Sequence, residues 1–374
     1  MTDKPRILFV SDVPDFKGGA ERSLFDLMSN PGIEPHSCVP EEGAISAEAQ
    51  KRGITNYTLD YGAVRQVRRP FKISDIINSF SSTFSAAKQL KSLCINNQID
   101  ILHTNGLKAH GVACFARILG GPPVIAHFRA IPFTPLEKIF WRAVKTLSSA
   151  LILVSRPCWP GKELPSKAQV VFNAIDVPED IQIKAPPQKP FILGFAGRIQ
   201  FTKGVLELID WVDYALAKDL DFKLLIRGEA APDEQGYFQD CIDKVAVAGL
   251  KERIIFEGRK EGLENIFAGL HANIVPSIVP DPLPRSVMEA SALGLPVLAY
   301  PAGGIPYMFE DGISGFLVKN EKEFYETLKS LIEDEALRDS VSKAARENAE
   351  ERFTMPRLHA EVLEIYRSVS ARDR

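Results

Sequence analysis

The sequence predicts an α/β fold made of two doubly wound domains, each with a parallel sheet between layers of helices. Short apolar stretches typical of buried strands alternate with longer stretches of helical periodicity. This alternation starts at Arg6–Ser11, stops over the charged and proline-rich residues 179–190, and restarts at Phe191–Gly197. Because each run opens with a strand and a glycine turn, we predict two Rossmann-like domains.

The first domain is predicted over residues 1–185 and the second over residues 190–354. Further strands are expected at 100–103, 124–127, 151–155 and 170–173 in the first domain, and at 222–227, 254–257, 272–275 and 297–300 in the second. Helices are expected at 19–28, 73–95, 203–217, 233–248, 261–269, 284–293, 321–333, 335–351 and 355–371, and between most strands of the first domain. We expect the terminal segment, about residues 355–374, to pack back onto the first domain.

Composition indicates a globular protein, because 45% of the 374 residues are hydrophobic and 25% are charged. Residues 1–6 show no signal-peptide pattern, and no apolar run approaches the roughly 18–20 residues that span a bilayer. Five scattered cysteines favour a reduced, cytoplasmic compartment. Residues 1–185 have a basic excess and the rest an acidic excess, so we expect the two halves to face different partners. The acidic net balance and the lack of a recognition motif disfavour nucleic acid as a partner.

The first glycine turn, Gly18-Gly19, follows the opening strand and precedes a predicted helix. Adjacent glycines accept positive φ angles and let the backbone approach a ligand, and N–H groups at a helix start favour an anion. The turn matches neither the G-x-G-x-x-G pattern of dinucleotide-binding folds nor a P-loop, which disfavours an NAD-linked oxidoreductase. A simple turn is the alternative interpretation.

The second glycine turn is followed by two cations. Gly197 ends the opening strand of the second domain, Arg198 follows directly, and Lys203 precedes the next helix. Both side chains are expected at the carboxyl edge of the sheet, where a pair of fixed cations can stabilise negative charge on a ligand. The alternative is two surface cations, each paired with a nearby carboxylate.

Two acidic residues follow a later strand of the second domain. Asp281 lies in a proline-rich loop, and Glu289 lies on a helix that Pro284 opens. A carboxylate close to a helix start can accept two hydroxyl groups at once, as a ribose presents them. The alternatives are a turn-forming role for Asp281 and a solvated helix position for Glu289.

Two histidines are expected at strand ends of the first domain. His103 closes the strand at 100–103 and His127 closes the strand at 124–127. A single histidine is more often structural, but two at equivalent positions of one sheet edge favour a functional site.

These motifs together resemble the retaining glycosyltransferases of the GT-B fold, family 4. The first turn matches the family's G-G-A-E loop, and residues 197–204 match its G-R-x-x-x-K-G pattern with one extra residue. Residues 281–289 are similar to its nucleotide-sugar signature, in which the first acid is usually Glu and here is Asp281. Downstream, G-G-I-P continues with Tyr307 in place of the usual Glu, and Asp311–Val318 matches D-G-x-S-G-F-L-V.

The resemblance implies two Rossmann-like domains facing a central cleft. It also implies a metal-independent retaining enzyme without a cofactor. It would move a sugar from a UDP-sugar or GDP-mannose to a hydroxyl of a glycan, lipid-linked or other acceptor in bacterial cell-surface synthesis. The implied catalytic residues are Asp281 and His127 at the sugar, and Arg198 and Lys203 at the diphosphate. The implied donor contacts also include Gly18, Gly19, Gly197, Gly228, Arg259, Lys260, Pro284, Arg285, Ser286 and, at the ribose, Glu289. His103, Asn105 and Arg129 are expected on the acceptor side.

Basic residues of the first domain indicate peripheral contact with the inner face of the membrane. Lys138, Arg142 and Lys145 share one face of a predicted helix, with Trp141 beside them. A second basic group precedes the helix at 73–95 and consists of Arg65, Arg68, Arg69 and Lys72. A solvated basic face is the alternative interpretation.

Two other functions are compatible with the same architecture. A sugar-nucleotide epimerase would convert a donor without an acceptor. A non-catalytic two-lobed protein would bind a ligand without chemistry, although such receptors normally carry a secretion signal.

Overall fold

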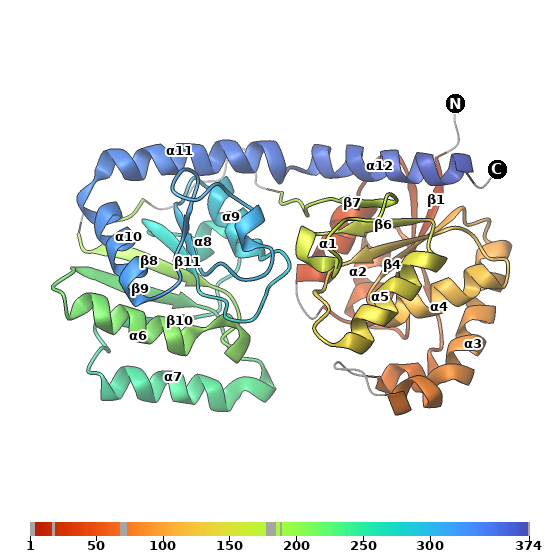
Figure 1. The fold of residues 1–374 in the computed structure, drawn as a ribbon, viewed down its shortest axis with the longest axis horizontal. Coiled ribbons are helices and arrows are strands. Elements are labelled where there is room, and N and C mark those ends of the chain that lie inside the picture. The colour runs from red at the N-terminus through yellow and green to blue at the C-terminus, as the bar shows by residue number, and fades with distance from the viewer. Residues whose placement is uncertain (1–3, 17–18, 68–72, 177–184, 188, 373–374) are drawn as a thin grey trace. The chain divides into compact units, whose positions relative to one another are not determined.

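The computed structural model describes residues 4–16, 19–67, 73–176, 185–187 and 189–372. They form two compact units, the first made of Met1–Ala174 with Met355–Arg374 and the second of Ile175–Thr354. Each unit is a parallel sheet covered by helices (Figure 1). The α/β class and the two Rossmann-like sheets predicted from the sequence are therefore confirmed.

Within the described residues, the first unit holds a seven-stranded sheet in the order β3-β2-β1-β4-β5-β6-β7. Its strands are β1 Arg6–Ser11, β2 Glu34–Val39, β3 Thr55–Thr58, β4 Ile101–Asn105, β5 Val124–Phe128, β6 Ala150–Leu153 and β7 Ala168–Val170. The central strands are buried on both faces, as expected for a parallel sheet, although β4 and β5 also carry buried polar side chains such as His103 and His127. The strand order reverses between β1 and β4, and ligands of such folds bind at the carboxyl ends of strands beside this switch point.

The helices of the first unit form two layers, one on each face of the sheet. They are α1 Gly19–Met28, α2 Ala44–Lys51, α3 Ile73–Asn96, α4 Leu107–Ile118, α5 Pro135–Leu147 and α12 Met355–Arg372. One core cluster packs Phe9 and Ile101 with α1 and α12, and the other packs Leu8 and Leu102 with α3 and α4. Helix α12 belongs to the first core through a buried stripe at helical spacing, which consists of Leu358, Val362, Ile365, Tyr366 and Val369.

The second unit holds a six-stranded sheet in the order β10-β9-β8-β11-β12-β13 among the described residues. Its strands are β8 Phe191–Ala196, β9 Phe222–Arg227, β10 Ile254–Gly258, β11 Ala272–Val275, β12 Val297–Ala299 and β13 Phe316–Leu317. Its helices are α6 Val205–Leu216, α7 Gln235–Val247, α8 Leu263–Ile266, α9 Arg285–Ala292, α10 Glu321–Glu333 and α11 Glu335–Arg352. The order reverses between β8 and β11, so the switch point of this sheet lies between those two strands.

Three elements of the first unit were missed in the sequence, namely β2, α2 and β3. Strand β2 begins with Glu34-Pro35-His36, which is typical of a loop, although Ser37, Cys38 and Val39 are fully buried. The strand predicted at 170–173 lies earlier, as β7. The pairing with β6 extends one residue beyond β7, because Val171 N–H donates to Leu153 O at 2.9 Å.

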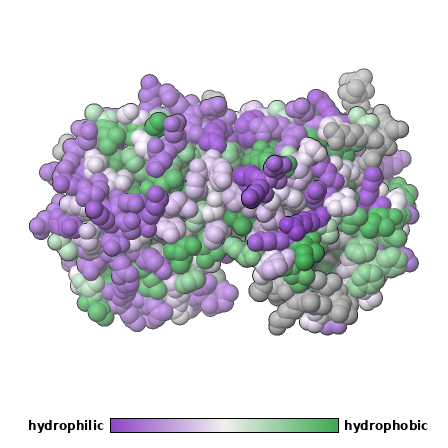
Figure 2. Space-filling view, viewed as in Figure 1, coloured by the Kyte–Doolittle hydropathy of each residue, from purple (hydrophilic) through white to green (hydrophobic). Residues whose placement is uncertain are grey.

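Apolar surface of the first unit gathers over α3 and α4 (Figure 2). Phe80, Phe84 and Ile118 are exposed there, and Lys88 Nζ lies 4.6 Å from the centre of the Phe84 ring. A cation above an exposed aromatic ring shields part of its apolar surface.

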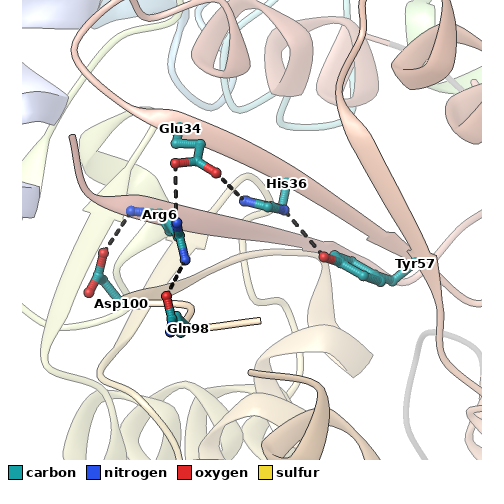
Figure 3. A network of polar contacts seen from close by, with 6 residues as sticks. All are labelled: Arg6, Glu34, His36, Tyr57, Gln98 and Asp100. Atoms are coloured by element: carbon teal, nitrogen blue, oxygen red, sulfur yellow. Dashed lines mark hydrogen bonds and ion pairs between the residues drawn. The ribbon is translucent and has the colours of Figure 1, made fainter. Parts of the chain in front are cut away.

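A polar network ties the amino ends of the first strands together (Figure 3). The Arg6 guanidinium lies 3.2 Å from Glu34 Oε2 and donates to Gln98 Oε1 at 2.7 Å. Glu34 Oε1 lies 3.3 Å from His36 Nε2, and His36 Nδ1 lies 3.5 Å from the Tyr57 hydroxyl. Burial raises the pKa of Glu34, but hydrogen bonds and charge from Arg6 outweigh it and lower the pKa. This network lies at the amino edge of the sheet, opposite to the carboxyl edge where ligands of such folds bind, so we assign it a structural role.

Candidate functional site

The switch point of the second unit brings a predicted cation and a predicted acid into direct contact. Lys203 lies in the loop after β8, and Asp281 lies in the loop after the neighbouring strand β11. Lys203 Nζ donates to Asp281 Oδ2 at 2.5 Å, and both side chains are about one-fifth exposed. The sequence placed both residues at this edge, but it did not indicate that they pair with each other.

The backbone around Asp281 is held by a glycine turn after β12. Gly304 N–H donates to Asp281 O at 2.8 Å, and Leu283 N–H donates to Asp281 Oδ1 at 3.1 Å. Gly303 has a φ of 64°, and a Cβ atom there would overlap the backbone of Asp281. Glycine is therefore required at position 303 for both its conformation and its close approach.

The loop after β8 presents Arg198 to solvent. Arg198 makes no hydrogen bond or ion pair with any residue that the structure describes. The loop itself is rigidly tied, because Gly197 N–H donates to Arg227 O and Ile199 N–H donates to Glu229 O. A Cβ atom on Gly228 would overlap Gly197 O, so the backbones of these two loops pass in direct contact.

Helix α9 carries the second predicted acid. Pro284 precedes the helix as its N-cap residue, and Ser286 is partly exposed in its first turn. Arg285 Nε lies 3.2 Å from Glu289 Oε1, one turn apart on the same helix. Both side chains are mostly covered, so Glu289 is not the solvated helix residue that the sequence left as an alternative.

The loops after β9 and β10 form the outer part of this edge. Gly228 N–H donates to Gly258 O at 2.9 Å, which joins the two loops. Arg259 is exposed and pairs with Glu229 at 3.4 Å and with Glu261 at 3.3 Å. Lys260 is half-buried beside it.

In the first unit, the two predicted histidines touch each other under the carboxyl edge. His103 Nε2 lies 3.0 Å from His127 Nδ1, and His103 Nδ1 lies 2.8 Å from the hydroxyl of Tyr366 on α12. His103 is 0% exposed and His127 is 1% exposed. Burial, and then the charge of Arg129, lower the pKa of each ring well below 6.5, so both are neutral at pH 7.

The prediction that His103 ends a strand is wrong. Strand β4 runs on to Asn105, which places His103 inside the sheet and not at its end. Both ring nitrogens of His103 are occupied, so the ring has no surface for an acceptor. Asn105 and His127 are register partners on β4 and β5, and neither Asn105 Oδ1 nor His127 Nε2 has a hydrogen-bond partner within the described part of the chain.

Asp12 follows β1 directly and was not predicted from the sequence as a site residue. Asp12 Oδ2 accepts from the N–H of Lys108 at 3.1 Å in the first turn of α4. Gly106 has a φ of 112°, and a Cβ atom there would overlap the Asp12 carboxylate. Burial raises the pKa of Asp12, and the contacts with Lys108 lower it in part. An acid directly after the first strand was the available signal.

The remaining predictions concern the glycine loop and metal ions. Gly19 begins α1, and Gly18 lies outside the described residues. Among the residues that the structure describes, no three His, Cys, Asp or Glu side chains are arranged to hold a metal ion.

Two family models match most of the chain. The model described as Glycosyltransferase Family 4 matches residues 17–158, and the model described as Glycosyl transferases group 1 matches residues 176–348. The chain belongs to glycosyltransferase family 4. The first of these matches includes the histidine pair, and the second includes Arg198, Lys203, Asp281 and Glu289.

Curated relatives of this family 4 chain differ in how much they align. Alpha-maltose-1-phosphate synthase of Mycolicibacterium smegmatis is 28% identical over 55% of this chain. The Escherichia coli UDP-Gal:alpha-D-GlcNAc-diphosphoundecaprenol alpha-1,3-galactosyltransferase is 22% identical over 97% of each chain. Several relatives of higher similarity align over only 46% to 58% of their own length.

Solved structures share the fold. Anabaena HepE (Alr3699), solved in complex with UDP, has a TM-score of 0.80 at 21% identity, with 97% of this chain and 100% of that chain covered. The GT-B fold predicted for this family 4 chain is thereby confirmed.

Two departures from the family pattern have local structural consequences. Pro284 has no N–H, so the first backbone donors of α9 come from Arg285 onward. Tyr307 replaces the usual Glu, and its side chain is 47% exposed while Arg352 donates to its carbonyl oxygen at 2.6 Å.

Proposed function

We propose that the chain is a retaining glycosyltransferase that binds the diphosphate of a nucleotide sugar at the β8–β11 switch point of the second unit. The observation that carries this proposal is the Lys203–Asp281 pair at 2.5 Å, together with Arg198 on the same loop as Lys203. Two cations and one carboxylate complement a ligand that joins an anionic diphosphate to a neutral, hydroxyl-rich sugar.

Donor binding exchanges the partner of Lys203 in this proposal. Without donor, the Asp281 carboxylate neutralises Lys203. A diphosphate carries more negative charge than one carboxylate, and Arg198 supplies a second cation for it. Once Lys203 turns to the phosphates, the Asp281 carboxylate accepts hydroxyls of the transferred sugar, and Glu289 accepts those of the ribose.

The proposed reaction breaks the bond between the anomeric carbon and the phosphate oxygen and forms a bond from that carbon to an acceptor oxygen. The acceptor attacks the face from which the phosphate leaves, so the configuration is retained. The leaving phosphate oxygen takes the acceptor's proton. Arg198 and Lys203 stabilise the negative charge that grows on the nucleoside diphosphate, and no step of this proposal uses a metal ion.

A UDP-sugar is the donor that the comparisons support best. HepE has also been solved in complex with UDP-glucose, with a TM-score of 0.76 and 21% identity to this chain. The name of the Escherichia coli relative specifies UDP-galactose. The base would lie against the loops after β9 and β10, at Gly228 and at Arg259-Lys260. GDP-mannose is the competing donor.

The acceptor is proposed to be a glycan or a lipid-linked sugar that the first unit binds. That relative is named for a diphosphoundecaprenol-linked acceptor. Contact with an anionic membrane is proposed through Lys138 and Arg142, which are exposed on α5 near the exposed side chain of Ile139. Trp141 does not take part, because it is 1% exposed and its Nε1 donates to Cys158 O.

The other basic residues expected at a membrane divide into three groups. Lys145 on α5 is half-buried. Arg65 is paired with Glu41. Arg68, Arg69 and Lys72 lie outside the described residues. No helix in the described part of the chain has both the length and the apolar composition to cross a bilayer.

Co-sedimentation with phosphatidylglycerol vesicles tests the proposed contact of α5 with a membrane. Lys138→Glu with Arg142→Glu should reduce binding, and Lys343→Glu with Arg346→Glu on α11 is the matched control.

The test of the function is a transfer assay with four donors, namely UDP-glucose, UDP-galactose, UDP-N-acetylglucosamine and GDP-mannose. Each donor is incubated with and without a polyprenyl-diphosphate-linked sugar, and with and without EDTA. We expect transfer from a UDP-sugar only when acceptor is present, unaffected by EDTA, with the anomeric configuration retained by NMR. Epimerised donor in the absence of acceptor would establish an epimerase. Saturable donor binding with no product from any acceptor tested would establish a binding protein.

A further inference from the structure

A chain of hydrogen bonds connects helix α12 to the carboxyl edge of the first sheet. It runs from the Tyr366 hydroxyl through His103 to His127 Nδ1. Arg129 Nη2 reaches the same Nδ1 atom at 3.3 Å, and Arg129 Nη1 donates to Asn173 Oδ1 at 2.7 Å. All five residues belong to the first unit.

The donors and acceptors in these hydrogen bonds determine which ring nitrogen of His103 and of His127 carries the proton. A guanidinium can only donate, so His127 Nδ1 must carry a lone pair, and the proton of the neutral ring sits on Nε2. The same lone pair faces His103 Nε2, which must therefore carry the proton of His103. His103 Nδ1 is then an acceptor, and the Tyr366 O–H donates to it.

We propose that Arg129, His103 and Tyr366 are positioning residues that hold His127 as the neutral Nε2–H tautomer. His127 then serves the proposed transfer as a hydrogen-bond donor to a ligand oxygen and not as a general base. The role in transfer rests on the proposed function, whereas the tautomer rests on the hydrogen bonds alone.

The charge of Arg129 decides which atom donates in each hydrogen bond from Tyr366 to His127. Without it, the same geometry permits the reverse order, in which His127 Nδ1–H donates to His103 and His103 donates to the Tyr366 oxygen. His127 Nε2 would then carry a lone pair and could accept a proton. Burial also raises the pKa of Tyr366 well above 10, so the phenol keeps the proton that it donates.

The unpartnered atoms indicate what the tautomer is for. His127 Nε2–H is a buried donor without a partner in the described residues, and Asn105 Oδ1 is a buried acceptor in the same state on the neighbouring strand. Leaving such groups unpaired destabilises the folded protein, because each has lost its hydrogen bonds to water. One sugar hydroxyl can accept from His127 and donate to Asn105, which would satisfy both. Neither atom is exposed here, so the residues that cover them must move before a ligand oxygen arrives.

The test is nitrogen-15 NMR of histidine-labelled protein, in which the chain's six histidines give separate pairs of ring signals. We expect His127 to show a protonated Nε2 and an unprotonated Nδ1 from pH 8 down to pH 6, without titration. A protonated Nδ1, or titration of His127 in that range, would overturn the proposal. His127→Gln identifies the signal.

Two pairs of variants separate positioning from simple packing. Arg129→Met should let His127 exchange between tautomers and should lower kcat by about 10–100-fold with little change in donor KM, whereas Arg129→Lys keeps a charged donor and should recover part of the loss. Tyr366→Phe should shift the ring signals of His103 and His127. Tyr57→Phe removes a hydroxyl that faces His36 Nδ1 at the opposite edge (Figure 3) and should leave those signals unchanged.

The outcomes distinguish this inference from the proposed function. If NMR shows the Nε2–H tautomer but no donor is turned over, the proposed function fails and the tautomer stands. If transfer occurs and His127 carries its proton on Nδ1, the positioning role fails and the function stands. A kcat that gains a new ionisation near neutral pH in Arg129→Met, and not in Arg129→Lys, supports both.

Discussion

The polar side chains at the carboxyl edges of the two sheets differ in burial, in charge and in their partners. In the first sheet, His103 and His127 are buried, neutral and tied into a directed chain of hydrogen bonds. In the second sheet, Lys203 and Asp281 are charged, partly exposed and paired with each other. Buried, neutral, hydrogen-bonded side chains keep each ring proton on one nitrogen atom. In a partly exposed ion pair, by contrast, one partner can be replaced by a ligand.

The largest effect should come from the cations of the second edge. Arg198→Ala and Lys203→Ala should each lower turnover by about 10²–10³-fold, because each removes one preorganised charge from the departing diphosphate. Steady-state kinetics with a UDP-sugar measures this. Arg253→Ala is the matched control, since Arg253 pairs with Asp221 ahead of β9 at the amino edge of the same sheet. Near-normal turnover in both site variants would contradict the proposal that Arg198 and Lys203 stabilise the departing diphosphate.

The next effect concerns the turn that supports Asp281. Gly303→Ala should lower the free energy of unfolding by about 1–3 kcal/mol through backbone strain and overlap with Asp281, and should also slow turnover. Gly312→Ala is the control, because Gly312 has a φ of 77° with no atom near its Cβ position. Equal losses of stability in both variants, measured by urea unfolding, would mean that the contact with Asp281 contributes nothing.

The buried histidines of the first unit should make its stability sensitive to acid. Burial, and then nearby charge, lower the folded-state pKa of His103 and His127, and burial lowers that of His110 to about 3. The unfolded chain therefore binds more protons below pH 6.5, so stability is complete above that pH and is lost as the pH falls. Each histidine that stays neutral should cost about 1.4 kcal/mol per pH unit.

Urea unfolding at pH 7.5, 6.5 and 5.5 measures this dependence. Removing one of the three residues with His110→Gln should make the slope shallower. Stability that is constant from pH 7.5 to 5.5 would show that the first edge is not the neutral, buried environment described above.

The smallest effect should appear in donor binding. Asp281→Asn removes the carboxylate that competes with phosphate for Lys203, so UDP should bind about 3–10-fold more tightly although turnover falls. Isothermal titration with UDP measures the first change. Weaker UDP binding in Asp281→Asn would contradict the exchange of partners at Lys203.

The sequence was informative wherever a strand end and a glycine turn coincide. Residues 197–204 and 281–289 were placed at one sheet edge because parallel strands share their polarity. The pairing of Lys203 with Asp281 could not be predicted, since it depends on which loops are neighbours across the β8–β11 switch point.

The errors in the first unit have local causes. His103 was taken as a strand end because the end of β4 was predicted two residues too early. Trp141 was grouped with Lys138 and Arg142, but it lies on the buried stripe with Val144, which packs inward. The contact between His103 and Tyr366 could not be predicted, because the two residues are 263 positions apart in the sequence.

The most direct test of the central claim is a crystal structure of the chain with UDP bound. We predict that the diphosphate lies within hydrogen-bond distance of Arg198 and of Lys203 Nζ, and that Lys203 has separated from Asp281. A diphosphate bound elsewhere, or an intact Lys203–Asp281 pair beside bound UDP, would contradict the claim.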